Sequence, residues 1–293
     1  MKMEGPLGED IRSSLTDDGC FLLKENGRCP HLLEDGLCRI ICECGDSALC
    51  DICREHPRFY NYYGGLCEWG ISLACESAAE LILCEKDPLC FFEEDRKEAA
   101  GEETDMALFS FLSQQRDAMM QFSLDESRSI SEKLYILEQW GIKLQNYIDN
   151  DGLGKQLFAF SNKSKENKPF FSQERWDRYK ELLVSLDPLD RAWKKRCAPL
   201  ATPEEKAEIS VGFSRLLAHF IYRYFLTYAL AGDVTAPIGL SLFGTSIILA
   251  LCEHEGRTAT EEIAQAAKDF SKEVECSEEN RDAVLDAFSA FAF

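Results

Sequence analysis

Basic residues are few in this sequence relative to acidic ones. The chain of 293 residues carries 32 lysines and arginines against 52 aspartates and glutamates, which gives a formal net charge of −20. Nucleic-acid phosphates are bound by clustered lysine and arginine, so no nucleic-acid partner is expected. An acidic surface favours a cationic partner, such as a lysine-bearing protein, although such a surface also simply keeps a protein dissolved.

A secretory leader is missing from the first ten residues, which are polar and contain glycine and proline. We therefore expect a cytoplasmic location, where thiols stay reduced and disulfides are rare. Residues 234–252 form an uncharged run of membrane length, but acidic residues flank it (Asp233, Glu253 and Glu255). A spanning helix normally has basic residues on one flank. This run predicts a buried core helix, and membrane association is not expected.

Several catalytic motifs are also absent. The chain has no G-x-G-x-x-G after a strand and no alternation of strands and helices, which excludes a Rossmann-type site and a doubly wound sheet. Cys38, Cys42 and Cys44 come near the C-x-x-x-C-x-x-C spacing of radical enzymes but do not match it. Four dispersed histidines give no Ser/His/Asp or Cys/His arrangement, so the sequence predicts no catalytic residue.

Cysteine, in contrast, is abundant and unevenly placed. Eleven of the fourteen cysteines lie between Cys20 and Cys90, whereas Cys197, Cys252 and Cys276 are scattered. A concentrated block indicates a metal site, while isolated cysteines usually behave as small core residues.

The spacing within this block leaves the metal open. Cys50-x-x-Cys53 is a C-x-x-C pair, and it is accompanied by Cys29, Cys38, Cys42, Cys44 and Cys75. Four thiolates suit Zn²⁺ and an iron–sulfur cluster equally, but zinc sites usually pair two C-x-x-C units. The irregular intervals favour a cluster. His31 and His56 are possible ligands, although such histidines more often make ordinary hydrogen bonds.

Local patterns predict short elements first and helices afterwards. Turn dipeptides at 26–27 and 35–36 predict two small hairpins. Residues 46–57 predict a two-turn helix whose positive end lowers the pKa of the Cys50 and Cys53 thiols. Residues 58–75 predict two aromatic strands around Gly64-Gly65.

Beyond the acidic stretch 93–105 the sequence is helical almost throughout, including a long helix from Thr202 to about 230 and a loop at 150–169. The predicted fold is therefore mostly α: a small, irregular cysteine-rich module with short hairpins that binds a metal or cluster (1–95), followed by an all-helical domain (96–293).

Several spaced landmarks resemble one known family. The segments "KENGRCPHLLEDGLCRI", "LCDICREHPRF" and "SLACESAAELIL" are similar to the recurring motifs of the flagellin lysine N-methylases. The distal segments "FIYRYFL" (220–226) and "FSKEVECSEEN" (270–280) resemble the C-terminal half of that family.

This resemblance implies an enzyme that transfers a methyl group from S-adenosylmethionine to a lysine amine on a protein such as flagellin, with an oxygen-sensitive [4Fe–4S] cluster. It marks cysteines as cluster ligands or their immediate neighbours (Cys29, Cys38, Cys50, Cys53 and Cys75) and Arg54 and Arg58 as flanking arginines. The alternative is a non-catalytic, Zn²⁺-stabilised protein-interaction module.

For three groups of side chains, the sequence allows two interpretations of their role. Arg54 or Arg58 pairs with the carboxylate of S-adenosylmethionine, or with nearby acids. The aromatic residues of 59–69 (Phe59, Tyr60, Tyr62, Tyr63 and Trp69) face a sulfonium or methylated lysine, or pack into the core. The acidic residues of 271–280 (Glu273, Glu275, Glu278 and Glu279) steer a cationic substrate, or form a solvated helix end.

The sequence also departs from the family pattern. Family members begin with an additional segment of spaced cysteines ahead of the first landmark, whereas this sequence has no cysteine before Cys20. The expectation is that the start is truncated or that part of the ligand set is lost, in which case Cys42, Cys44 and Cys67 are the candidates to compensate.

Overall fold

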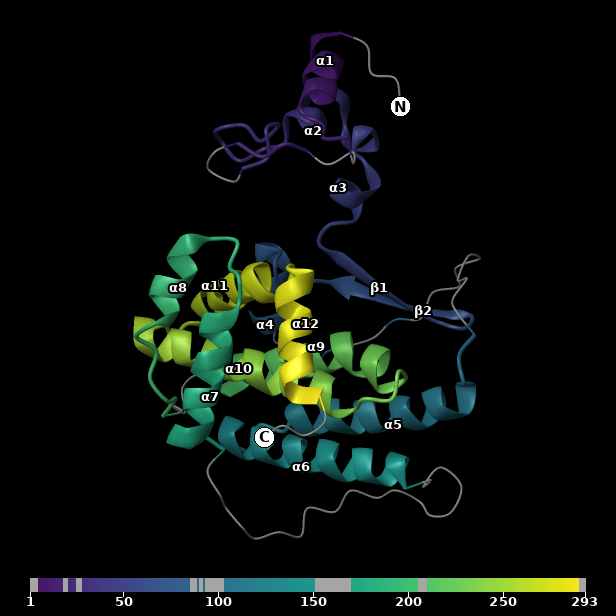
Figure 1. Ribbon diagram of the computed structural model, residues 1–293, viewed down its shortest axis with the longest axis vertical. Helices are drawn as coiled ribbons and strands as arrows, with labels where there is room; N and C mark the ends of the chain where they lie inside the picture. The colour runs from purple at the N-terminus through teal and green to yellow at the C-terminus, as the bar shows by residue number, and fades with distance from the viewer. Residues whose placement is uncertain are drawn as a thin grey trace. The chain divides into compact units, whose positions relative to one another are not determined.

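The computed structural model describes residues 5–17, 21–24, 28–84, 89, 92, 103–150, 170–204 and 210–289. The chain forms two compact units, Met1–Arg58 and Phe59–Phe293. Helices dominate the described residues, and the strands form one two-stranded ribbon, which confirms the predicted mostly α fold (Figure 1). The predicted boundary at 95–96 falls outside the described residues. The two strands of the ribbon and the helix that follows them belong to the second unit rather than to the cysteine-rich unit.

The first unit consists of short elements joined by turns. Its elements are α1 (Pro6–Ser13), α2 (Arg39–Cys44), the 3₁₀ turn η1 (Asp46–Ala48) and α3 (Asp51–Glu55). The predicted hairpin at 35–36 is present: the Leu33 N–H donates to the Leu37 carbonyl at 2.9 Å, and Gly36 has φ of 86°. The other turn dipeptide, at 26–27, lies outside the described residues.

The predicted two-turn helix over 46–57 is interrupted. Leu49 and Cys50 have extended backbones, with ψ of 144° and 162°, so the segment divides into η1 and α3. Cys50 therefore precedes a helix of five residues rather than sitting inside a longer one.

The second unit begins with the predicted ribbon and continues as helices. Its elements are β1 (Arg58–Tyr63), β2 (Leu66–Ile71), α4 (Glu76–Cys84), α5 (Met106–Ser123), α6 (Ile130–Asp149), α7 (Gln173–Ser185), α8 (Arg191–Cys197), α9 (Ser210–Ala229), α10 (Thr235–Glu255), α11 (Thr260–Phe270), the π-helical turn η4 (Ser271–Glu275) and α12 (Glu278–Phe288).

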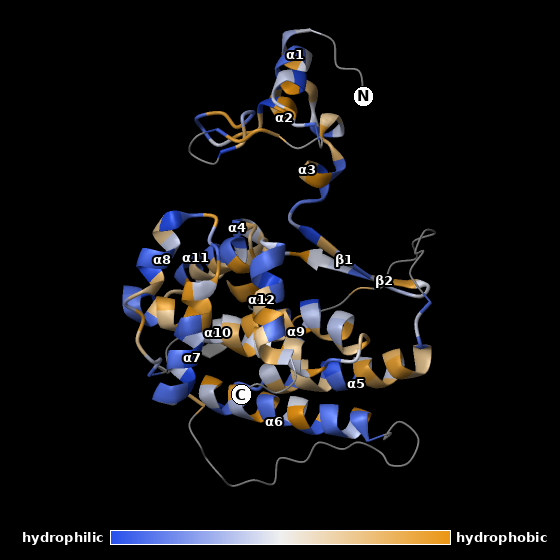
Figure 2. Ribbon diagram, viewed as in Figure 1, coloured by the Kyte–Doolittle hydropathy of each residue, from blue (hydrophilic) through white to orange (hydrophobic). Residues whose placement is uncertain are grey.

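Helix α10 is the centre of this unit. It packs against α6, α9, α11 and α12, and every residue from Thr235 to Cys252 is buried. It is long and apolar enough to cross a membrane (Figure 2). Its whole apolar window, however, is buried inside the fold. The predicted buried core helix at 234–252 is confirmed. A helix that is apolar on all sides needs neighbours on all sides.

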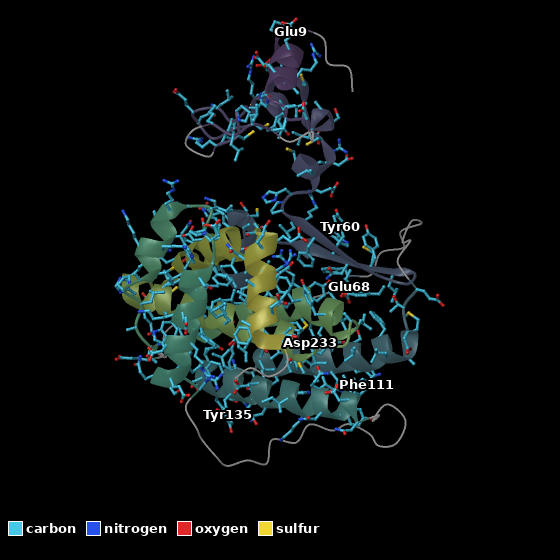
Figure 3. All side chains as sticks on the ribbon, viewed as in Figure 1. Glu9, Tyr60, Glu68, Phe111, Tyr135 and Asp233 are labelled. Atoms are coloured by element: carbon cyan, nitrogen blue, oxygen red, sulfur yellow. The ribbon has the colours of Figure 1, made fainter. Side chains whose placement is uncertain are left out.

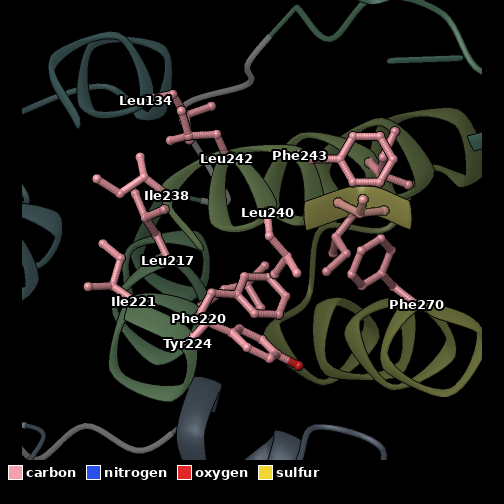
Figure 4. Close-up of a cluster of buried hydrophobic side chains, with 14 of the residues drawn as sticks. Leu134, Leu217, Phe220, Ile221, Tyr224, Ile238, Leu240, Leu242, Phe243 and Phe270 are labelled. Atoms are coloured by element: carbon pink, nitrogen blue, oxygen red, sulfur yellow. The ribbon is translucent and has the colours of Figure 1, made fainter. Parts of the chain in front are cut away.

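Aromatic side chains fill the space around α10. Phe243 from α10 lies 6.2 Å from the Phe270 ring and 6.1 Å from the Phe288 ring, centroid to centroid. Phe220 from α9 lies 6.1 Å from Phe270. Figure 4 shows these α9, α10 and α11 side chains meeting in one cluster. Edge-to-face contacts of this kind add to the stabilisation from apolar burial.

Two helix starts differ from the sequence-based expectation. Residues 201–204 are not helical and α9 begins at Ser210, so Thr202 is not its N-cap; instead the Thr202 hydroxyl donates to Gln173 Oε1 at 3.2 Å. Asp233, identified above only as an acidic flank of a core run, accepts hydrogen bonds from the Thr235 and Ala236 N–H groups, each at 2.9 Å. It therefore caps α10.

The close packing of α10 on α12 gives a testable prediction. A Cβ at Gly239 would overlap the Phe288 ring, so Gly239→Ala should destabilise the fold by roughly 1–3 kcal/mol. The matched control is Gly212→Ala on α9, where the new Cβ would sit 3.4 Å from Ile263 and the gain in helix propensity is retained. Urea unfolding of both variants tests this, and equal stabilities would contradict it.

Candidate functional site

Four cysteines of the first unit lie close to one another. Cys29 and Cys38 belong to the hairpin that precedes α2, where Leu32 pairs with Cys38 and the Leu32 N–H donates to the Cys29 carbonyl. Cys50 and Cys53 flank the first turn of α3. The Cys53 thiol forms a hydrogen bond with the Cys50 side chain and interacts electrostatically with Cys50, Cys29 and Cys38. The hairpin and α3 thus gather four thiols from the landmark motifs.

The expected low thiol pKa at this position is wrong for Cys53. Its pKa is raised to about 11, first because the surrounding chain removes water from the sulfur, and then because of the hydrogen bond and like charge from Cys50 and the other thiols. A helix of five residues is too short to oppose these effects. Ligand binding at the Cys53 sulfur must therefore displace a proton.

The donor set fits a metal or cluster in type and number, because four thiolates complete the ligand set of Zn²⁺ or of a [4Fe–4S] cluster. The described side chains are not arranged as a finished cage, since no three His, Cys, Asp or Glu residues among them are placed to hold an ion. Of the other candidates, Cys75 belongs to the second unit, and Cys42 and Cys44 lie on α2, where they are exposed as Cys50 and Cys53 are.

The flanking arginines make local contacts. Arg54 donates to the Asp51 carboxylate at 3.1 Å and to the Leu49 carbonyl at 2.7 Å. Arg58 donates to the Arg54 carbonyl at 2.7 Å. Both side chains close the loop around α3, and both residues remain exposed, so a carboxylate from outside can still reach them.

His31 is a structural residue of the first unit. Its Nε2 lies 2.9 Å from the Ser14 hydroxyl and its ring meets Phe21 edge-on at 4.9 Å. Burial, and then the nearby Arg39 charge, lowers its pKa. His31 is buried with a partner of its own, whereas His56 is exposed.

Alternate residues of a strand point to opposite sides, so the aromatic residues of β1 fall on two faces of the ribbon. Figure 3 labels Tyr60 on this strand. Phe59 and Tyr63 face the helices: Phe59 lies edge-on to His219, and the Tyr63 hydroxyl pairs with Thr227 at 3.1 Å. Tyr60 and Tyr62 stack on each other with centroids 6.5 Å apart, and Tyr62 is 49% exposed. Core packing is confirmed for Tyr63, which is buried, whereas Phe59 is half-buried and Trp69 is 40% exposed.

A second polar cluster lies inside the helical unit, where the segments 220–226 and 270–280 meet. Arg223 from α9 donates through Nη1 to Glu275 Oε1 at 2.8 Å and to the Ser72 hydroxyl at 2.9 Å. The Tyr224 hydroxyl donates to the same Glu275 oxygen at 2.6 Å. Ser72 also pairs with Ser271 at 3.0 Å. We call Ser72, His219, Arg223, Tyr224 and Glu275 the buried polar cluster.

The position of Glu275 depends on the π-helical turn η4. The Cys276 N–H donates to the Ser271 carbonyl at 2.9 Å, five residues back, which widens the helix by one residue. Asn280 holds this turn by donating to the Glu273 carbonyl at 2.8 Å. The wider turn places Glu275 against α9, and π-helical turns of this kind are frequent at functional sites.

The expectation of a solvated helix end at 271–280 is wrong for half of its acids. Glu273 is 4% exposed and accepts from the Asp190 N–H at 3.0 Å, and Glu275 is 2% exposed. Glu278 and Glu279 are exposed as expected. The available sequence signal was Arg223, a charged residue in an otherwise apolar helix, but its partner is distant in sequence.

Two atoms of this cluster have no hydrogen-bond partner among the residues that the structure describes. They are His219 Nε2 and Glu275 Oε2, and both are sealed from solvent. Burial lowers the pKa of His219 to about 4, which keeps its ring neutral near pH 7. Unsatisfied buried polar atoms are costly and therefore mark a possible site of binding or catalysis.

Comparison with known proteins gives one relationship. The chain is 31% identical over 93 residues to the flagellar biosynthetic protein FliU of Salmonella muenchen, and the match covers 27% of this chain and 55% of that protein. The same identity and length relate it to the lysine N-methylases of Salmonella typhimurium and Salmonella choleraesuis, with 23% of each covered. The chain is distantly related to the flagellin lysine N-methylase family. The expected resemblance is thereby confirmed.

The relationship to the lysine N-methylases rests on a partial match, since the aligned region spans about half of FliU and about a quarter of the other two proteins. No family model matches the chain, and no solved structure matches it.

Burial of neutral His219 predicts a pH-dependent stability. In the unfolded chain the histidine has a pKa near 6.5, and in the folded chain His219 has a pKa of about 4. Between these two pH values the unfolded chain binds a proton at this residue and the folded chain does not. The contribution of neutral His219 to the free energy of unfolding is fully present above pH 6.5 and is lost as the pH falls towards 4. Between pH 7.5 and 5, the wild type should lose about 2 kcal/mol more than His219→Gln. Urea unfolding at both pH values measures this.

The control for this comparison is His254→Gln, because His254 is exposed. Its pH-dependent loss should equal that of the wild type. If His219→Gln also matched the wild type, the ring would not be held neutral by burial.

Proposed function

We propose that this protein methylates lysine side chains of other proteins, with S-adenosylmethionine as the methyl donor and a [4Fe–4S] cluster as a cofactor. The observation that carries the proposal is the gathering of Cys29, Cys38, Cys50 and Cys53, the cysteines of the landmark motifs, in a chain related to the lysine N-methylases. Related proteins named lysine N-methylase and flagellar biosynthetic protein support a flagellin-like substrate. We propose that the reaction takes place in the cytoplasm.

The chain's own residues supply the ligands and the positioning. The four thiols would hold the cluster, and binding it would require them to lose their protons. When bound, such a cluster supplies iron that exchanges electrons and accepts ligand atoms. Arg54, fixed by Asp51 and the Leu49 carbonyl beside the cysteines, offers two-point binding to the carboxylate of S-adenosylmethionine. The net charge of −20 favours encounter with a lysine-bearing substrate.

Metal analysis of cysteine variants tests the ligand set. The full chain, purified without oxygen, should be brown and contain about four irons and four sulfides. Replacing any one of the four gathered cysteines by serine should remove most of the iron. The matched controls Cys42→Ser and Cys75→Ser should keep it.

Two results would contradict this assignment. A colourless chain with one zinc would support the non-catalytic, zinc-stabilised interaction module instead. Iron loss in Cys75→Ser as severe as in Cys53→Ser would overturn the four-cysteine ligand set.

Charge reversal tests the role of Arg54. Arg54→Glu should weaken binding of S-adenosylmethionine at least tenfold, because a carboxylate would then face a carboxylate, while the iron content stays the same. Arg12→Glu, at another exposed arginine of the first unit, is the control and should change neither quantity. Isothermal titration with the donor, together with iron analysis, measures both. Loss of iron in Arg54→Glu would show that this arginine only supports the fold around α3.

A further inference from the structure

The buried polar cluster contains a pair of atoms that no described residue satisfies, one on Glu275 and one on His219, and Glu275 is the first charged group that acts on His219. Glu275 Oε1 accepts from Arg223 at 2.8 Å and from Tyr224 at 2.6 Å, whereas Glu275 Oε2 accepts from no described group. His219 Nε2 is equally without a partner. The residues are 2% and 8% exposed, so bulk water does not satisfy these atoms.

The charges around this pair are already balanced. Glu275 is paired with Arg223, and burial keeps His219 neutral. The other titratable groups around the cluster are Tyr224 on α9, Cys276 beyond η4 and Arg281 on α12. Burial raises the pKa of Tyr224 and of Cys276, which favours their uncharged forms. The Arg281 charge is paired with Glu278 and Asp282. The cluster has no net charge to offer a cation, and it suits a neutral group that donates hydrogen bonds.

We propose that His219 Nε2 and Glu275 Oε2 bind an uncharged primary amine, one N–H donated to each atom. In this arrangement His219 carries its proton on Nδ1, and the lone pair of the amine nitrogen stays free. A free lone pair on an uncharged nitrogen is what a nucleophile requires in methyl transfer. That the amine is a lysine side chain rests on the proposed function; an α-amine is the other source of the same chemistry.

Phe59 packs against two residues of the buried polar cluster. Its ring lies edge-on to His219 with centroids 6.3 Å apart and 5.0 Å from the Arg223 guanidinium carbon. The ring occupies space left by Gly70, where a Cβ would come within 2.6 Å of Phe59 Cζ. Phe59 is only half-buried, so in this proposal it is the side chain that must turn to admit an amine.

Nuclear magnetic resonance of the full chain labelled with ¹⁵N-histidine tests the proposal. The His219 resonance is the one that persists when His31, His56 and His254 are each replaced. The probes are Nα-acetyl-lysine methylamide, which carries only a side-chain amine, methioninamide, which carries only an α-amine, and Nα-acetyl-norleucine methylamide, which carries neither. The titrations are made in 150 mM NaCl, which screens attraction to the acidic surface.

The lysine probe should shift the His219 Nε2 resonance, and its apparent affinity should rise about tenfold per pH unit from pH 7 to 9, as the uncharged amine becomes more abundant. Glu275→Gln should weaken binding at least tenfold. Glu278→Gln, which removes an exposed carboxylate nearby, should leave it unchanged. A saturating response to methioninamide instead, with a plateau above pH 8, would support the site with an α-amine as its ligand.

The norleucine probe should have no effect. No shift of His219 with either amine, or an affinity that does not rise with pH, would overturn the proposal and leave a bridging water as the occupant. These measurements need no methyl donor. Failure here together with normal lysine methylation would reject the amine site alone, whereas amine binding without methylation would reject the proposed function.

Discussion

The fold of the second unit depends on one constraint: α10 is apolar on every side and must be covered on every side. Its residues from Thr235 to Cys252 are all buried, and α6, α9, α11 and α12 provide the cover. Gly239 and Gly244 let Phe288, Phe220 and Phe270 approach the helix closely. Because every side of α10 must be covered by a neighbouring helix, the positions of α9 and α11 are fixed. The polar residues on the sides of α9 and α11 that face away from α10 are thereby fixed as well.

The buried polar cluster is a consequence of this arrangement. Once α9 and α11 pack on α10, the segments on either side of Arg223 and Glu275 meet, and the π-helical turn places Glu275 opposite Arg223. Burying such a pair is expensive unless further hydrogen bonds support it. Ser72 and Tyr224 provide them, yet Glu275 Oε2 and His219 Nε2 remain unsatisfied. A fold that tolerates two such atoms in its interior indicates a use for them.

The cysteine-rich unit follows a different principle. Its helices are short, and Leu22, Leu23, Ile41 and Ile52 are exposed. Such a unit has little apolar burial to stabilise it, and the free energy of metal or cluster binding is the usual substitute in small cysteine-rich modules. The convergence of Cys29, Cys38, Cys50 and Cys53 is consistent with that role.

The sequence alone determined the mostly α fold, the ribbon around Gly64-Gly65 and the burial of the run 234–252, because periodicity, turn chemistry and continuous apolarity are local properties of a chain. It also identified the cysteine block. Tertiary structure decided which cysteines meet, that Glu275 is buried rather than solvated, and that His219 lies beside it. The physical reason is distance along the chain: Arg223 and Glu275 are 52 residues apart, and a partner that far away leaves no mark on the local pattern.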